Sequence, residues 1–173
     1  MKIAILGFSG SGKSTLAQTL GEISGAPVLH LDTVQFLPNW QVREAEEKQR
    51  LVEDFLDSYP SWVIDGNYRK LSYDRRLREA DQIWILLFGR ATRLWRVCRR
   101  YWQYKGKSRP DMAEGCPEKL DGEFVRWVLW DGCTPESRER MYDVVRQYPE
   151  KSHLLENQRQ VDACLRLFRE GRL

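Results

Sequence analysis

A glycine-rich segment near the start of the chain has the residue types needed to bind phosphate. It comprises residues 7–14, Gly-Phe-Ser-Gly-Ser-Gly-Lys-Ser, and follows the apolar residues 3–6 directly. Glycines let the backbone wrap closely around phosphate oxygens, and a helix that begins after them favours an anion at its N-terminus. We expect Lys13 to reach the β- and γ-phosphates of a nucleotide and Ser14 to hold Mg²⁺. The predicted nucleotide-binding residues are Gly7, Ser9, Gly10, Ser11, Gly12, Lys13, Ser14 and Thr15.

Two carboxylates stand at the ends of later apolar runs, where they would face the same rim as Lys13. Ligands of open α/β sheets gather at the carboxyl ends of the strands. Asp65 follows the apolar residues 62–64, and we expect it to hold Mg²⁺ through water. Its alternative role is to cap a turn before Gly66. Asp32 is expected to act as a metal-side carboxylate or as a general base toward an acceptor hydroxyl, with helix capping as the alternative.

Arginines in two regions could bind phosphate groups or an acceptor. Arg69 follows Asp65 by four residues and could clamp an acceptor phosphate or carboxylate, or simply be a surface residue. Arg96 and Arg100 share one face of a predicted helix, which also carries Arg93. Arginines there could stabilise the charge that develops during phosphoryl transfer. The alternatives are a solvated basic face, or pairing with acids such as Glu114, Glu118 or Asp121.

Three other groups of residues are expected to have structural or no catalytic roles. His30 lies in the middle of a predicted strand and is expected to pack in the core. Four tryptophans are expected to form a small core of their own rather than a base-stacking platform. The cysteines form no CxxC pair, which disfavours a zinc site and favours reduced cytosolic thiols. The tryptophans are Trp95, Trp102, Trp127 and Trp130.

Apolar runs alternate with helical patterns along the chain, which predicts a parallel sheet covered on both faces. The expected strands are Lys2–Leu6, Val28–Leu31, Trp62–Asp65, Gln82–Phe88 and Ser152–Leu155. The expected helices are Lys13–Glu22, Arg43–Ser58, Tyr73–Ala80, Arg90–Tyr104, Gly122–Trp130, Pro135–Gln147 and Gln160–Glu170. The predicted fold is a three-layer α/β/α P-loop NTPase with a five-stranded parallel sheet. We expect one domain over residues 1–173, with a mobile lid inserted near 105–121.

The charge distribution calls for an anionic partner. The net charge is only +3, yet residues 90–109 contain eight basic and no acidic side chains. Phosphate is the obvious candidate. No apolar stretch approaches the 18 or so residues of a membrane span, so no membrane partner is expected. The first strand begins at Lys2, which leaves no room for a signal peptide and favours the cytoplasm.

These residues resemble those of the adenylate kinase-like P-loop kinases. The resemblance implies that Asp65 binds a magnesium-bound water, that Arg69 binds the acceptor phosphate, and that Arg96 and Arg100 close over the transferred phosphoryl group. The chain has Asn67-Tyr68 where adenylate kinases carry Phe-Pro, which disfavours adenylate as the acceptor. A more specific resemblance, to the bacterial DNA topology modulation proteins, covers residues 5–14, 29–32, 62–68 and 106–116.

The sequence therefore predicts an ATP- and Mg²⁺-dependent phosphotransferase that acts on an unidentified small acceptor. The acceptor would sit over Asp32 and Arg69 while the lid excludes water. The alternative is a nucleic-acid-associated ATPase or regulator that affects DNA topology and holds phosphates with residues 90–109. No DNA-reading motif is present, and no Asn-Lys-x-Asp motif favours GTP over ATP.

Overall fold

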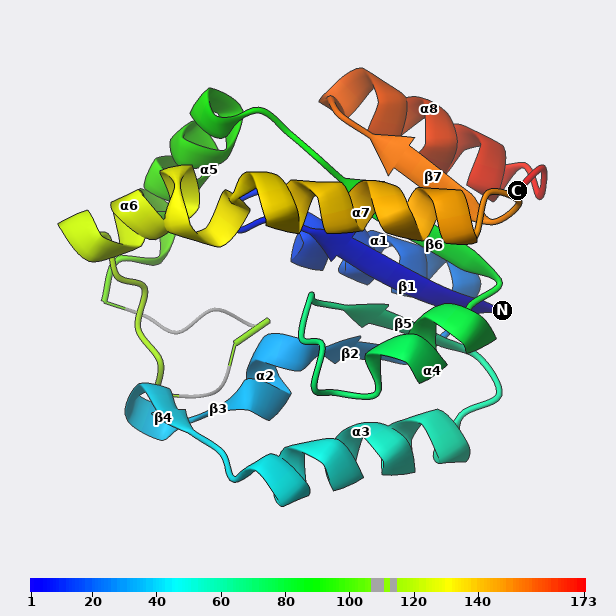
Figure 1. Cartoon of the computed structure of the whole chain (residues 1–173), viewed down its shortest axis with the longest axis horizontal. Helices are drawn as coiled ribbons and strands as arrows, with labels where there is room; N and C mark the ends of the chain where they lie inside the picture. Colours follow the sequence, from blue (N-terminus) through cyan, green and yellow to red (C-terminus); the bar gives the residue numbers. More distant parts are fainter. Residues whose placement is uncertain (107–110, 113–114) are drawn as a thin grey trace.

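A five-stranded parallel sheet forms the centre of the molecule. The computed structural model describes residues 1–106, 111–112 and 115–173 (Figure 1). The sheet has the order β2-β5-β1-β6-β7, and each neighbouring pair is parallel. This confirms the predicted sheet, with small differences at the strand ends. The strands are β1 (Lys2–Gly7), β2 (Val28–His30), β5 (Trp62–Asp65), β6 (Gln82–Leu86) and β7 (Ser152–Leu155).

Helices cover both faces of the sheet. Side chains of β1 alternate between two apolar clusters: Ala4 and Leu6 belong to one, Ile3 and Ile5 to the other. The first cluster contains residues of α3, α4 and α7, and the second contains residues of α1 and α8. Figure 1 shows α7 in front of the sheet and α1 behind it. The helices are α1 (Lys13–Ser24), α3 (Ala45–Ser58), α4 (Tyr73–Glu79), α5 (Arg90–Tyr104), α6 (Gly122–Leu129), α7 (Pro135–Gln147) and α8 (Gln158–Arg169).

The segment after β2 contains elements that the sequence pattern does not predict. A short helix, α2 (Leu31–Gln35), leads into an antiparallel pair, β3 (Phe36–Leu37) and β4 (Gln41–Val42). The 3-10 turn η1 (Pro38–Trp40) joins the pair, with Asn39 and Trp40 both at φ +62°. A second 3-10 turn, η2 (Asp131–Cys133), follows α6. Elements of two to five residues are too short to produce a hydrophobic period.

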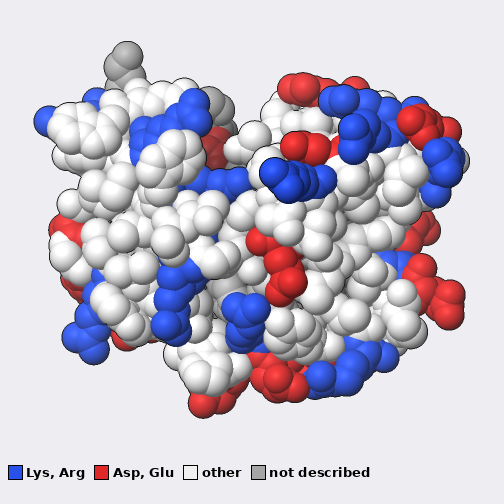
Figure 2. All heavy atoms as spheres, turned by 90° about the horizontal axis from the view of Figure 1, so that it is seen from above, with Lys and Arg blue, Asp and Glu red and all other residues white. Residues whose placement is uncertain are grey.

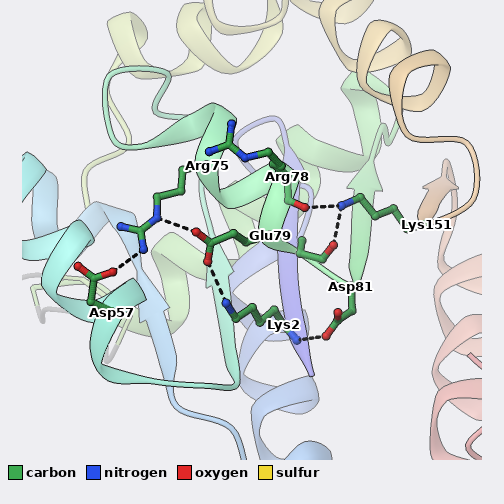
Figure 3. A network of polar contacts seen from close by, with 8 residues as sticks. Lys2, Asp57, Arg75, Arg78, Glu79, Asp81 and Lys151 are labelled. Carbon is green, nitrogen blue, oxygen red and sulfur yellow. Dashed lines mark hydrogen bonds and ion pairs between the residues drawn. The ribbon is translucent and has the colours of Figure 1, made fainter.

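A network of charged side chains closes the end of the sheet where β1 begins (Figure 3). The backbone N–H of Lys2 donates to Asp81 at 2.7 Å, and its ammonium group pairs with Glu79 at 2.8 Å. Arg75 joins Glu79 to Asp57. The ammonium group of Lys151 donates to three carbonyls at the end of α4, at 2.6–2.9 Å. Lys151 therefore caps α4 and ties it to the loop before β7.

Two further features bear on the sequence predictions. All four cysteines carry free thiols. No helix among the described residues is long and apolar enough to cross a bilayer.

Candidate functional site

The glycine-rich segment forms a tight loop between β1 and α1. Gly7, Gly10 and Gly12 have φ values of +147°, +78° and +94°, which other residues rarely adopt. A Cβ at Gly10 would lie 2.6 Å from the carbonyl oxygen of Arg93, and one at Gly12 would lie 3.1 Å from Nη1 of Arg96. The backbone conformation therefore requires glycine at all three positions, and at Gly10 the close backbone oxygen leaves no space for a side chain.

Two arginines of α5 hold the loop through its carbonyl groups. Arg93 is almost fully buried, and its guanidinium donates to the carbonyls of Phe88 at 3.2 Å and Ser9 at 3.5 Å. Arg96 donates to the carbonyl of Ser11 at 2.6 Å and to the side chain of Gln158 at 2.8 Å. Partial burial lowers the pKa of Arg96. The sequence pattern predicted that these arginines lie on one helix. It could not indicate that Arg93 is buried and holds the loop from behind.

Asn67 holds the start of the same loop from the other side. Its side-chain carbonyl accepts the Gly7 N–H at 3.0 Å, and its amide donates to the Gly7 carbonyl at 2.6 Å. The side chain thus pairs with Gly7 as a neighbouring strand would. The position of Asn67 just after β5 is the signal in the sequence that could have indicated this role, which was not predicted.

Asp65 joins the loop to β2. One of its oxygens accepts the Ser14 hydroxyl at 3.0 Å, and the other lies 2.6 Å from Nδ1 of His30. His30 and Asp65 face each other across the β2–β5 pair. A carboxylate next to a hydroxyl at a phosphate-binding loop has the oxygen donors that Mg²⁺ prefers. The Ser14–Asp65 pair therefore fits the predicted magnesium position.

His30 lines a cavity and is not a core residue, so the sequence prediction for it is wrong. Burial by itself would lower the pKa of His30. The hydrogen bond to Asp65 and the charges of Asp65, Asp111 and Asp32 outweigh that effect and raise it. The strand register decides this outcome, because it puts the imidazole opposite a carboxylate.

Asp32 and Tyr68 form a second polar pair. The Tyr68 hydroxyl donates to one oxygen of Asp32 at 2.6 Å. Burial, the charge of Asp32 and this hydrogen bond raise the pKa of Tyr68, so the phenol keeps its proton and remains a donor. Asp32 lies in the first turn of α2, but the N-cap of that helix is His30. Asp32 therefore does not cap this helix, which was the alternative role expected for it.

A buried arginine shapes the loop that carries Tyr68. Arg76 has no exposed surface, and its guanidinium donates to the carbonyls of Leu71, Gly66 and Tyr68 at 2.9, 3.3 and 3.0 Å. Burial lowers the pKa of Arg76 to about 10. This role of Arg76 was not predicted, because an arginine in a helix is normally a surface residue.

One cavity of about 1830 Å³ connects most of the predicted site residues. Residues 7–15, Asp32, Asp65, Arg96 and Arg100 all line it. The ammonium group of Lys13 donates to the Phe8 carbonyl at 3.2 Å. Arg69 is exposed and does not line the cavity. Figure 2 shows the surface notched between two lobes, with lysine and arginine side chains beside the notch.

The described part of residues 105–121 packs on the β3–β4 pair and on α5. The Gly115 carbonyl accepts the Asn39 N–H at 3.1 Å, and Cys116 Sγ accepts the Trp40 N–H at 3.4 Å. Arg100 pairs with Glu118 at 3.0 Å, one of the pairings anticipated for the basic helix face. Lys107, Arg109, Glu114 and much of the resembling segment 106–116 lie outside the described residues.

The four tryptophans are exposed, so the predicted small core is wrong. Their exposed fractions are 59% for Trp95, 71% for Trp102, 50% for Trp127 and 55% for Trp130. For the two tryptophans of α5, the reason is the orientation of this helix, which turns Arg93 and Val97 inward instead. Trp95 and Trp127 line the cavity, whereas Trp102 and Trp130 do not.

Comparison with known proteins identifies the fold. No family model and no curated protein matches the chain. Shikimate kinase from Acinetobacter baumannii in complex with shikimate aligns with 98% of this chain and 92% of its own, at 16% identity and a TM-score of 0.58. TT1252 from Thermus thermophilus aligns at 18% identity and 0.57, covering 99% and 97%. Shikimate kinase from Bacteroides thetaiotaomicron aligns at 15% and 0.52, covering 99% and 97%.

The chain thus has the α/β fold of the P-loop kinases. The likeness extends over nearly the full length of both chains, so it covers the sheet, the loop and the helices around them. At 15–18% identity it identifies the fold alone.

Proposed function

We propose that the protein transfers the γ-phosphoryl group of ATP to a small acceptor in the presence of Mg²⁺. The observation that carries this proposal is a single cavity that joins the glycine loop to Asp32 and to the Ser14–Asp65 pair. Phosphoryl transfer needs the nucleotide, the metal and the acceptor in one enclosed space. The shared fold with shikimate kinases adds support.

The loop would bind the nucleotide phosphates through its backbone N–H groups and Lys13. In the described structure Lys13 contacts the Phe8 carbonyl, so it would exchange this contact for phosphate oxygens. Ser14 and Asp65 would hold Mg²⁺, which neutralises phosphate charge when bound. Arg96 and Arg100 line the same cavity and would stabilise the charge on the transferred group.

Asp32 would orient the acceptor and take up its proton. The attacking oxygen forms a bond to the γ-phosphorus while the bond to the β-phosphate oxygen breaks, and the proton passes to the carboxylate. Tyr68 holds Asp32 in position for this step. Arg69 has no part in the proposal, because it does not line the cavity. Residues 105–121 would act as the lid that keeps water from the γ-phosphate.

A nucleic-acid-associated ATPase is the second candidate, in keeping with the resemblance to DNA topology modulation proteins. The observation in its favour is two exposed ring–cation pairs, Trp95 with Arg99 on α5 and Trp102 with Lys105 at its C-terminus. The ring centres lie 5.6 and 5.5 Å from the cations. Exposed rings can stack on bases, and the cations can contact phosphates. DNA-stimulated ATP turnover with a steep dependence on salt would favour this candidate.

The test is ATP binding and turnover by the purified protein with Mg²⁺ and a panel of acceptors. We expect transfer to a small acceptor, and a loss of about 100-fold or more in turnover for Lys13→Ala. Lys70→Ala, which changes an exposed lysine outside the cavity, is the matched control. Unchanged melting temperatures would show that both variants fold. Full turnover by folded Lys13→Ala would contradict the role of the loop, and stimulation by DNA alone would favour the second candidate.

A further inference from the structure

We propose that the acceptor is an uncharged hydroxyl compound with a flat ring, of the nucleoside class, and that it carries neither phosphate nor carboxylate. The proposal rests on the proposed phosphotransferase function and specifies its acceptor. It follows from the size of the whole cavity and from the charges and rings of its acceptor side, meaning the part lined by β2, α2, β3, η1 and the residues after β5.

Carboxylates dominate the acceptor side. Asp32 and Asp65 line the cavity, and both act on His30 through their charges. Mg²⁺ at Asp65 would offset the charge of that carboxylate and leave Asp32 beside the acceptor. An acceptor with its own negative charge would lie against Asp32, and like charges in a binding site oppose binding. The site therefore disfavours an anionic acceptor.

The arginines that follow β5 do not supply a counter-charge. Arg69 is exposed outside the cavity, and Arg76 is fully buried with its guanidinium on three backbone carbonyls. Arg96 and Arg100 are assigned above to the transferred phosphoryl group and not to the acceptor; Arg96 also binds the glycine loop, and Arg100 pairs with Glu118. Two further described cations line the cavity: Lys119, 5.8 Å from the Trp40 ring centre, and Arg99 of α5, 5.6 Å from the Trp95 ring centre. Within the segments that line the acceptor side, no described guanidinium offers an acceptor phosphate the paired bonds that such groups usually receive.

Asp32 is arranged to accept a hydrogen bond from a hydroxyl. Tyr68 donates to one carboxylate oxygen, and the other has no hydrogen-bond partner within the described residues. A nucleoside hydroxyl could donate to this second oxygen. Its oxygen would then form the bond to the γ-phosphorus as ADP leaves, and the proton would pass to Asp32 and on to solvent.

Aromatic rings form one wall of the acceptor side. Phe36 and Trp40 line the cavity in edge-to-face contact, with centroids 5.3 Å apart, and Tyr68 lines it as well. Asn39 and Trp40 are fixed by their bonds to Gly115 and Cys116, so this wall is preorganised. Aromatic side chains bind flat rings by stacking. A single-ligand pocket typically measures about 300–1,000 Å³, so a cavity of about 1830 Å³ has room for ATP and a second compound of nucleoside size.

The experiment measures phosphoryl transfer from γ-labelled ATP to matched pairs of acceptors. Each ribo- and deoxyribonucleoside is compared with its own 5′-monophosphate at equal concentration. In the preferred pair, we expect kcat/KM to be at least about 10-fold higher for the nucleoside than for its monophosphate, because only the monophosphate brings negative charge next to the carboxylates. A preference for the monophosphate overturns this proposal and leaves the phosphotransferase function standing. Transfer to neither member of any pair also overturns it, whereas loss of ATP binding and turnover altogether would contradict the proposed function itself.

A pair of tryptophan variants tests the ring wall. Trp40→Leu is expected to raise KM for the preferred nucleoside about 10-fold through loss of stacking, with the Kd for ATP unchanged. Trp102→Leu is the control, because Trp102 is 71% exposed and does not line the cavity. Unchanged ATP binding also reports that each variant folds. An equal change in KM for the two variants, or none for Trp40→Leu, would overturn the assignment of the wall.

Discussion

The two ends of the parallel sheet use the same kinds of charged residue in different ways. At the end where β1 begins, Lys2, Glu79 and Arg75 pair with one another or with nearby charges (Figure 3). At the end where the strands finish, Arg76 and Arg93 bind backbone carbonyls. The first arrangement closes a surface, and the second shapes loops around a cavity.

The difference shows how a site can be made rigid without losing its charge. An arginine bound to carbonyls fixes a loop without taking up a carboxylate, so Asp32, which accepts from Tyr68 at one oxygen, keeps the other for a ligand. A carboxylate in an ion pair already has its partner. Exposed ion pairs contribute about 0–1 kcal/mol each, whereas a buried carbonyl that loses its donor costs about 1–3 kcal/mol. The site end should therefore be far more sensitive to substitution than the closed end.

The largest contrast is expected between two adjacent arginines of α4. Arg76→Ala removes the donors of three carbonyls, and we expect the free energy of unfolding to fall by about 3 kcal/mol. This loss is smaller than the summed cost of three unpaired carbonyls, because the substitution also removes a buried charge. Arg75→Ala breaks partly exposed ion pairs and should cost less than about 1 kcal/mol. Urea denaturation measures both. Equal losses would mean that the carbonyl contacts of Arg76 contribute no more than a surface pair.

Two glycines on either side of α1 are expected to respond differently to a side chain: Gly10 in the loop before the helix and Gly25 at its C-terminus. Gly10→Ala would put a Cβ 2.6 Å from the Arg93 carbonyl at a φ of +78°, and we expect ATP affinity to fall about 100-fold as the loop deforms. Gly25→Ala, at φ +67° with nothing within 4 Å of the new Cβ, should cost about 1 kcal/mol of stability and leave ATP binding intact. Calorimetric titration with ATP separates the two. Normal ATP affinity of Gly10→Ala would argue against this loop as the phosphate site.

Lys151→Ala tests the helix cap at the closed end. Loss of three carbonyl contacts at the end of α4 should lower the free energy of unfolding by about 1–2 kcal/mol, since the ammonium group is partly solvated. ATP affinity should not change, because the cap lies at the opposite end of the sheet from the loop. A loss of ATP affinity without a loss of stability would contradict this separation of the two ends.

The smallest effect is expected from His153 on β7, which packs 5.6 Å from the Trp84 ring. Burial lowers the pKa of His153, so the unfolded chain binds the proton more readily than the folded one. The contribution of His153 to the free energy of unfolding is therefore fully present above its unfolded-state pKa of about 6.5. It declines as the pH falls through and below that value. His153→Gln should lose less stability than the native chain between pH 7.5 and 5.5, measured by thermal melting. Parallel losses in the two proteins would contradict burial as the cause.

The sheet and the loop could be predicted because their signals are local and strong. Runs of apolar residues identified all five strands, and α5 and α7 have the predicted bounds. The segment from α2 to β4 was missed, because its elements are too short to produce a period. The tryptophans were misassigned for a different reason: helical spacing identifies a face, but not whether that face meets the core or solvent.

The acceptor side depended on contacts between distant parts of the chain. The facing of His30 and Asp65 comes from the register of two strands that are 35 residues apart in the chain. The exposure of Arg69 and the burial of Arg76 depend on how the loop after β5 turns. Patterns of residue type encode neither the register of distant strands nor the path of this loop. Arg69 was therefore expected to clamp the acceptor, and the role of Arg76 was not predicted.

The parallel sheet and the phosphate-type loop follow from the sequence, because apolar period and glycine spacing act within a few residues. Which polar side chains meet in the cavity, and which support it from behind, depends on the tertiary structure. Arg76 and Arg96 are chemically the same, yet one is buried against carbonyls and the other lines the cavity. The burial of a side chain and its distance from residues far away in the chain are fixed only when the helices pack on the sheet. These two quantities determine the role of each charged side chain.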